Sequence, residues 1–489
     1  MSQTPRVLIA ALLIAGVASA PSSALGQGDR AAETRAPDSS PMQADELQQL
    51  RMLFEHGGTP GLSIAFVRDG QVHTSVALGR RRADTPGEVG ADTVFEAASL
   101  SKPVFAWIVL ELVEQGVLDL DQPLEGYFAY PDLAHDERAQ LVTARQVLSH
   151  TSGLPNWRRG GSRLEFTLDP GTAWAYSGEG FVWLQRVVEH VTERSLQDLA
   201  QERVFGPLGM TDSSFVWRET FEEDCAHGHR PIGVAYSKVH PELGNSAHSL
   251  HTTASDYARF LAATLAALKA KDGFMRGALA PAVEVSPGVA WGLGWGLQQD
   301  ERGAAIWHWG HNGGYRAFVI GDPERGTGLV YFTNGDDGLS ILEAVLDTWV
   351  GEGPHAAAEH LGYTPFDPER TSWLQRLETL AREIGVAEAI NEYFAGLEGD
   401  AARVLDATML ATLGYSLLFD QQVEQALEVF SLGTDRHAND PDLWTGLART
   451  LETQGDRDGA LASLRRALEV APADRWARDA LTRLEQTPH

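Results

Sequence analysis

The chain has 489 residues and a formal net charge of −28 at pH 7, from 67 acidic and 39 basic side chains. Its length exceeds that of one ordinary core, so we expect two domains. The acidic balance argues against a nucleic-acid partner or an anionic membrane, because both are bound through basic surfaces.

The first 26 residues have the pattern of a secretory signal. Arg6 supplies the positive charge, Val7 to Val17 the apolar core, and residues 24–26 a small-residue cleavage site. Residues 27–42 are rich in Ala, Ser, Pro and Asp, which favours a flexible leader. The apolar run is too short to cross a bilayer, so we expect a secreted or periplasmic protein without a membrane span.

A helix and a hairpin come next. Residues 44–56 are predicted to be helical, and strands are predicted at 62–67 and 72–78. Asp69 and Gly70 between the two strands form a hairpin-turn signal.

Ser99 and Lys102 stand three residues apart before an apolar run, Val104 to Val117, that has the pattern of a helix. Pro103 suits the first turn of a helix, so Ser99 is expected at the helix N-terminus with Lys102 on the same face. A desolvated lysine has a lowered pKa and can take the proton of a serine nucleophile. An isolated pair of this kind is usually a helix cap beside a solvated lysine. Here, however, Lys102 is the only one of four lysines with a Ser three positions earlier.

Two loops carry further candidates. Residues 146–155 end a short helix and continue into a turn-rich loop that contains His150. His150 could be a catalytic base, but we favour a structural role in which it forms hydrogen bonds within the loop. Tyr176 lies in a Gly-rich loop, residues 169–180, before a helix predicted at 181–192. Its phenol could face a cleft or pack on the loop, and the residues alone leave both open.

The single Cys225 excludes an intramolecular disulfide and a Cys-rich zinc site. The acidic residues before it raise its pKa, so a structural or incidental Cys is expected. His227, His229, His248 and His251 have no acidic or Cys partner at ligand spacing. We therefore expect no metal and no cofactor.

Residues 291–334 contain several short strand-like runs, and residues 339–350 form a predicted helix. With the first hairpin, they predict an antiparallel sheet flanked by helices, in the α/β (α+β) class. The strands are expected at 291–297, 307–315, 316–320 and 329–333, with a turn at 323–326.

From about residue 365 the pattern is helical only. Positions 444–472 fit the 34-residue tetratricopeptide pattern, and the preceding 34 residues repeat it. A degenerate unit at 373–394 precedes these repeats, and residues 476–484 can cap them. The repeated positions are Gly414, Leu417, Ala426 and Phe430, which correspond to Ala448, Leu451, Ala460 and Leu464.

Residues 43–352 resemble the penicillin-recognising serine hydrolases, and most of all class C β-lactamases, family VIII carboxylesterases and related D-amino-acid peptidases. The resemblance rests on Ser99-x-x-Lys102, a loop tyrosine, the phrase at 148–155, and His308-Trp309-Gly310 before a strand. It implies a β-lactamase/transpeptidase-like fold.

The resemblance also implies a role for each matched residue. Ser99 would be the nucleophile and Lys102 its proton acceptor, and Tyr176 would be the first residue of the family's Y-x-N motif, acting as general base with Lys102. His308 would take the place of the Lys in the K-T-G motif, with Gly310 in contact with substrate. The backbone N–H groups of Ser99 and His311 would form the oxyanion hole.

Two departures from the family pattern concern the substrate. Gly178 stands where Y-x-N has Asn, and His308 replaces Lys, so a fixed positive charge becomes dependent on pH. Both departures weaken the case for a β-lactamase or a carboxypeptidase. Neither changes Ser99, Lys102 or Tyr176, the residues expected to carry out acylation.

We therefore expect an exported serine hydrolase that cleaves an ester or amide through an acyl-enzyme, most of all an esterase. A β-lactamase or D-amino-acid peptidase is one alternative. A catalytically weak interaction protein that uses its repeats to bind a protein partner is another. The expected boundaries are 1–26 for the signal peptide, 27–42 for the leader, 43–352 for the hydrolase domain, 353–372 for a linker and 373–489 for the repeats.

Overall fold

The structure is a computed structural model, and it describes most of the chain from residue 44 onward. The expected signal peptide and leader lie outside the described residues. The described ranges are 44–158, 163–230, 235–270, 280–300, 303–351, 353–363, 407–419, 421–472 and 474–486, with scattered positions in 275–277 and 377–389.

The first three elements match their predictions. Helix α1 spans Ala44–His56, and strands β1 (Gly61–Arg68) and β2 (Gln71–Gly79) form a hairpin. Both turn residues, Asp69 and Gly70, have positive φ angles of 52° and 71°. This is the backbone that an Asp-Gly hairpin turn requires.

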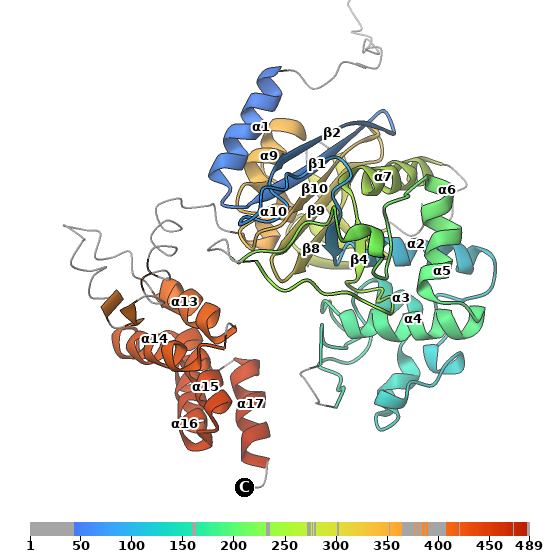
Figure 1. Cartoon of the computed structure of the whole chain (residues 1–489). Coiled ribbons are helices and arrows are strands. Elements are labelled where there is room, and N and C mark those ends of the chain that lie inside the picture. Colours follow the sequence, from blue (N-terminus) through green and yellow to red (C-terminus); the bar gives the residue numbers. More distant parts are fainter. Residues whose placement is uncertain are drawn as a thin grey trace, which may run out of the picture. The chain divides into compact units, whose positions relative to one another are not determined.

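The hairpin joins a sheet that is completed by strands from the second half of the hydrolase domain. Within the described residues the sheet has eight strands in the order β2-β1-β10-β9-β8-β7-β6-β5, and every neighbouring pair is antiparallel. The predicted antiparallel sheet is therefore confirmed (Figure 1). The later strands are β5 Val283–Ser286, β6 Val289–Trp291, β7 Gly296–Asp300, β8 Gly303–Asn312, β9 Tyr315–Asp322 and β10 Thr327–Thr333.

Each face of the sheet has its own hydrophobic core. Along β10, Leu329 and Tyr331 belong to one cluster, and Val330 and Phe332 belong to the other. This alternation follows from the two-residue period of a strand. The first cluster is covered by α1, α9 (Leu342–Trp349) and α10 (Ala356–Leu361), and the second by α2 (Ser101–Glu114) and α7 (Ala254–Lys269) (Figure 1).

A helical region extends the second core, and a short two-stranded sheet, β3 (Phe95–Ala98) with β4 (Leu250–Thr252), lies beside it. Helix α4 begins at Gly178, three residues earlier than predicted, because the Ser177 side chain caps it by accepting from Gly180 N at 2.9 Å. The helices are α3 Ala144–Leu148, α4 Gly178–Thr192, α5 Leu196–Ala200 and α6 Gly206–Leu208, with single turns at Leu124–Gly126, Pro131–Leu133, Glu137–Leu141, Gln201–Phe205 and Glu219–Phe221.

The C-terminal helices, taken by themselves, form the predicted antiparallel repeats. The Phe430 ring packs on two glycines, since a Cβ at Gly414 or Gly446 would lie 2.7 or 2.0 Å from it. The degenerate unit predicted at 373–394 lies largely outside the described residues. The helices are α13 Ala407–Phe419, α14 Val423–Arg436, α15 Pro441–Gln454, α16 Arg457–Val470 and α17 Arg475–Gln486.

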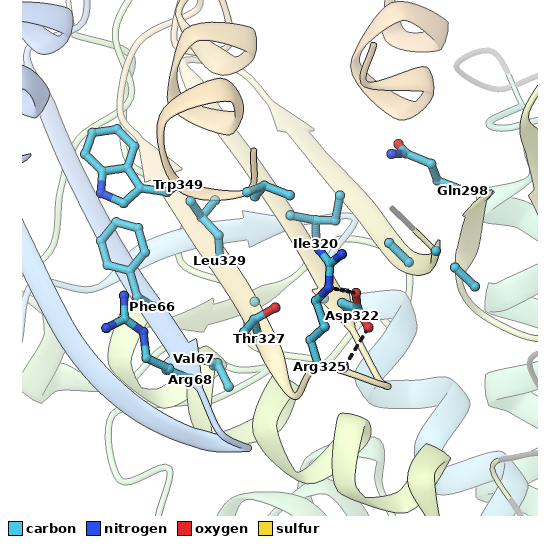
Figure 2. Close-up of a pocket in the computed structure, with 16 residues that line it drawn as sticks. Phe66, Val67, Arg68, Gln298, Ile320, Asp322, Arg325, Thr327, Leu329 and Trp349 are labelled. Atoms are coloured by element: carbon cyan, nitrogen blue, oxygen red, sulfur yellow. Dashed lines mark hydrogen bonds and ion pairs between the residues drawn. The ribbon is translucent and has the colours of Figure 1, made fainter. Parts of the chain in front are cut away.

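A cavity of about 240 Å³ lies between the sheet and the end of α9. Phe66 and Trp349 line it on one side, and the ion pair of Arg325 with Asp322 lines it on the other (Figure 2). None of the candidate catalytic residues borders this cavity. Across the parts of the chain that the structure describes, no helix has both the length and the apolar character needed to cross a membrane.

Candidate active site

Ser99 lies in a tight connection between β3 and α2. The preceding residue, Ala98, has a φ of +50°, a left-handed conformation that costs a non-glycine residue about 1–2 kcal/mol. Helix α2 begins at Ser101, so Ser99 precedes the first helical turn, and its carbonyl accepts from Lys102 N at 3.0 Å. The strained turn leaves the Ser99 side chain partly exposed.

Lys102 is fully buried in the first turn of α2. Its Nζ lies 3.1 Å from Ser99 Oγ and donates to the carbonyl of Ala247 at 2.9 Å. Burial lowers the pKa of Lys102 well below its usual value. This favours the neutral amine, which has a lone pair to accept the Ser99 proton. The predicted pairing of the two residues is confirmed.

The neighbouring Ser101 has a different task. Its hydroxyl donates to the carbonyl of Ala98 at 2.7 Å and accepts from Leu250 N at 2.9 Å. Both bonds fasten the turn before α2 to strand β4. Ser101 is therefore a structural residue, and of these two serines only Ser99 bonds to Lys102.

Tyr176 lies in the loop before α4, with its ring 4.7 Å from Lys102 Nζ. The ring packs between His150 and Trp309, at centroid distances of 4.2 and 4.7 Å. The hydroxyl has no hydrogen bond of normal geometry to another described residue. Burial raises the pKa of Tyr176, and the nearby Ser99 hydroxyl lowers it. The residues alone left open whether the phenol faces a cleft or packs on the loop. The structure places Tyr176 beside the Ser99–Lys102 pair.

His150 supports the loop that carries Tyr176. It is fully buried, its Nδ1 accepts from Ser177 N at 3.0 Å, and its carbonyl accepts from Ala175 N at 2.7 Å. Burial lowers the pKa of His150 well below its usual value. The expected loop hydrogen bonds are present, and they hold the residues on either side of Tyr176.

His308 lies in β8, fully buried beside this cluster. Its Nδ1 is 2.8 Å from the carbonyl of Trp309, so we assign the proton to Nδ1 and leave Nε2 as an acceptor. Burial and the charge of Lys102 lower the pKa of His308 to about 3. At this pKa the imidazole is neutral near neutral pH, so the pH-dependent positive charge expected at His308 would appear only in acid.

The end of β8 passes close to β3. A Cβ on Gly310 would lie 2.4 Å from the carbonyl oxygen of Ala97, so only glycine fits there. Strand β7 pairs with β8 no further than Trp307, which leaves the last residues of β8 without a partner on that edge. Residues 308–312 therefore run along the strand that leads into Ser99.

The register of the β8–β9 hairpin orients the backbone of His311. Asn312 pairs with Tyr315 across a two-residue turn, and this closing pair is a hydrogen-bonded one. Because hydrogen-bonded and non-hydrogen-bonded pairs alternate, His311 turns its N–H away from β9. That edge faces β3. The His311 side chain is exposed, with Nδ1 3.2 Å from the hydroxyl of Tyr363.

Gly178, where the family motif has Asn, is packed against a loop. A Cβ there would lie 2.8 Å from both the carbonyl oxygen of Asn156 and the ring of Trp157. The Trp157 ring also stands edge-on to His248, with centroids 5.4 Å apart. The loop therefore occupies the space into which a longer side chain at residue 178 would extend.

We expect that Gly178→Asn, which restores the family motif, lowers stability by about 1–3 kcal/mol through overpacking and adds no turnover of a β-lactam. The measurements are the thermal midpoint and nitrocefin hydrolysis. Gly116→Asn is the matched control, because Gly116 has open space around it and its φ of +71° tolerates Asn. A Gly178→Asn protein as stable as wild type that has gained nitrocefin hydrolysis would contradict this.

His229, which lies outside this cluster, is held by backbone groups. His229 accepts from Ala83 N at 3.0 Å through Nε2, and its Nδ1 lies 2.8 Å from the carbonyl of Asn334. Among the described residues no three His, Cys, Asp or Glu side chains form a group that could hold a metal. Cys225 is buried, and this burial raises its pKa.

Two contacts at the site were missed by the sequence analysis. The carbonyl of Ala247 holds Lys102, and the ring of Trp157 fills the space beside Gly178. A main-chain carbonyl has no side-chain signature, so its residue type gives no signal. Trp157 lies two residues after the matched phrase at 148–155, but nothing in the sequence places it on Gly178.

Comparison with known proteins agrees with this geometry. A family model described as Beta-lactamase matches residues 44–345, and one described as Tetratricopeptide repeat matches residues 441–484. Penicillin-binding protein 4 of Amycolatopsis lactamdurans is 27% identical over 359 residues, which cover 67% of this chain and 94% of the relative.

Two solved structures share the fold. The octameric penicillin-binding protein homologue from Pyrococcus abyssi has a TM-score of 0.54 at 22% identity, covering 68% of this chain and 82% of its own. D-alanine carboxypeptidase AmpC from Burkholderia cenocepacia has a TM-score of 0.53 at 21% identity, covering 62% of this chain and 100% of its own.

Proposed function

The chain belongs to the Beta-lactamase family of serine hydrolases, and from that premise we propose that it cleaves esters through an acyl-enzyme on Ser99. The observation that carries the proposal is the distance of 3.1 Å between Ser99 Oγ and the Nζ of the fully buried Lys102. A serine needs a nearby base to become a nucleophile. Burial favours the neutral form of the Lys102 amine, which can act as that base.

In the proposed acylation, neutral Lys102 takes the Ser99 proton while Oγ attacks the ester carbonyl carbon. The carbonyl oxygen becomes an oxyanion that accepts from the backbone N–H groups of Ser99 and His311. The proton then passes through the Tyr176 hydroxyl to the leaving alcohol as the C–O bond breaks. Tyr176 suits this transfer because its ring lies beside Lys102 and its hydroxyl near Ser99.

Deacylation reverses the direction of proton transfer. Water gives a proton to the Tyr176–Lys102 pair and attacks the acyl carbon, and the proton returns to Ser99 as the acid leaves. His308 and His150 pack against Tyr176 from two sides, with ring centroids 6.2 and 4.2 Å away. Both are neutral at neutral pH because burial lowers their pKa values, so they position the phenol without competing for protons.

The preference for esters rests on two positions. An amide or β-lactam substrate in this family relies on the Asn of Y-x-N and the Lys of K-T-G. Here the loop at residues 156–157 packs on Gly178, and His308 is a neutral, buried side chain. An ester has a better leaving group than an amide, and its cleavage depends less on protonation of that group. Ester hydrolysis therefore tolerates both changes. β-Lactam or D-amino-acid peptide hydrolysis is the alternative.

We expect kcat/KM for p-nitrophenyl acetate or butyrate to exceed that for nitrocefin on the same preparation. The reason is that an ester does not need the missing amide-binding and carboxylate-binding groups. Ser99→Ala serves as the blank for both substrates. Nitrocefin hydrolysis faster than that of either ester by about tenfold, or ~1.4 kcal/mol in barrier, would overturn the ester preference.

Two further proposals concern the ends of the chain. The signal-like pattern of residues 1–26 supports export to the periplasm or the exterior. The tetratricopeptide match at 441–484 supports binding of a protein partner by the C-terminal helices. Neither proposal changes the chemistry assigned to Ser99.

A further inference from the structure

A buried polar network that the proposed chemistry does not use lies next to the site. Glu96, on β3, accepts from two side chains. Lys238 Nζ is 3.1 Å from its Oε1, and Asn312 Nδ2 donates to its Oε2 at 2.8 Å. Each carboxylate oxygen thus has its own donor.

The network lies mostly out of contact with solvent. The side chains of Lys238 and Glu96 are only 7% and 11% exposed. Lys238 is also 3.0 Å from the Tyr315 hydroxyl, which donates to the carbonyl of Ala226 at 2.8 Å. Burial raises the pKa of Glu96, but Lys238 and Asn312 outweigh it, so the pKa lies below its usual value. Hydrogen bonds to a buried carboxylate are strong, so Glu96 fixes the positions of Lys238 and Asn312.

Asn312 connects the network to three catalytic segments. Its side-chain amide donates to Glu96, three residues before Ser99, and at 3.4 Å to the carbonyl of His248. His248 follows Ala247, whose carbonyl holds Lys102. Asn312 itself follows His311. One amide therefore links the segment that leads to the nucleophile, the segment whose carbonyl holds the base, and the residue next to the second oxyanion donor.

The backbone around Asn312 needs such support. Two glycines follow it in the turn, and Gly314 has a φ of +72°. The far side of the turn is fastened by Arg316, which donates to the carbonyl of Asn312 at 2.9 Å and pairs with Asp336 at 2.8 Å. The side-chain amide of Asn312 donates to Glu96 and to the carbonyl of His248. We expect that without these two bonds the end of β8 would move relative to Ser99.

We propose that Glu96 and Asn312 are positioning residues for the acyl transfer, which fix the distance between the two backbone N–H donors of the oxyanion hole. The inference rests on the proposed function. Oxyanion stabilisation depends on donors already in place at the moment of attack, and it acts on the transition state more than on the bound substrate. Loosening the network should therefore lower kcat and leave KM almost unchanged.

The test compares Asn312→Ala with Asn334→Ala. Asn334 is a buried asparagine outside the site, and its amide donates to the carbonyls of Arg80 and Arg81 at 3.0 and 2.9 Å. Both variants lose two hydrogen bonds donated by one side-chain amide, so both should lower the thermal midpoint. Only Asn312→Ala should lower kcat for p-nitrophenyl butyrate per folded enzyme. We expect a fall of about 10- to 100-fold, less than for outright loss of an oxyanion donor.

A second variant and a second readout keep the outcome decisive. Glu96→Gln should show the same fall in kcat with KM within about threefold, and it replaces Asn312→Ala if that protein does not fold. The rate of labelling by a fluorophosphonate should fall in proportion. Equal kcat values for the Asn312 and Asn334 variants, or an effect confined to KM, would overturn the positioning role. Absence of Ser99-dependent labelling in the wild-type protein would instead refute the proposed function.

Discussion

Replacing Ser99 by alanine is expected to abolish fluorophosphonate labelling and to lower ester turnover by about 10⁴-fold or more. The hydroxyl is the atom that bonds to the acyl group, and no other described serine is known to contact Lys102. Because members of a catalytic unit are not additive, Tyr176→Phe should lower turnover by nearly as much. The measurements are labelling stoichiometry and kcat/KM for p-nitrophenyl butyrate.

Ser101→Ala is the control for this experiment. Its hydroxyl bonds to Ala98 and Leu250, whereas Lys102 bonds to Ser99, so the variant should still be labelled. Loss of the two buried bonds should lower its thermal midpoint. Labelling that survives in Ser99→Ala would show that the nucleophile is another residue.

The nucleophile could be predicted because its signal is local. Ser99, Lys102 and Pro103 lie within five residues at the start of a helix, and the spacing of three predicts that the two side chains lie close together. Tyr176 and His308 belong to other elements, and only the resemblance assigned them to the same site. The structure then brought both to Lys102 through packing, which the sequence does not specify.

What the sequence could not predict was the environment of each group. The Lys in K-T-G suggested a charge at His308, yet full burial and the nearby Lys102 leave the imidazole neutral near pH 7. Burial at this position depends on Trp291, Tyr176 and Trp309, which contact His308 from three different parts of the fold. The network of Glu96 and Asn312 was missed for the same reason.

In the fold, too, the features with a local sequence signal could be predicted, and the long-range strand pairings could not. The hairpin β1–β2 and the turn before β10 have local signals in Asp69-Gly70 and in residues 323–326. The pairing of β1 with β10 joins residues such as Leu62 and Thr333, which are far apart in the chain. No local pattern specifies such a pairing, since the two-residue period sets which side chains face each core but not which strand lies alongside.

Replacing Lys102 by methionine is expected to lower ester turnover by on the order of 10³-fold or more, because it removes the proton acceptor of Ser99. Lys102→Arg is the informative companion. Arginine keeps a positive charge but has no lone pair at any accessible pH. If Lys102 acts as a neutral base, both variants should lose activity. Substantial kcat/KM in Lys102→Arg would show that a cation, and not a base, is needed.

The lowered pKa of Lys102 also predicts how activity and stability depend on pH, and both should increase as the pH rises. Activity should fall as the pH is lowered through the folded-state pKa, because the amine is then protonated. Between that pKa and the unfolded value near 10.5, the unfolded chain binds more protons, so the free energy of unfolding should rise with pH. Lys102→Met should raise the thermal midpoint at neutral pH and flatten this dependence, since it removes a buried ionisable group. A midpoint below that of wild type, with an unchanged slope, would show that Lys102 is held as a charged side chain in the folded protein.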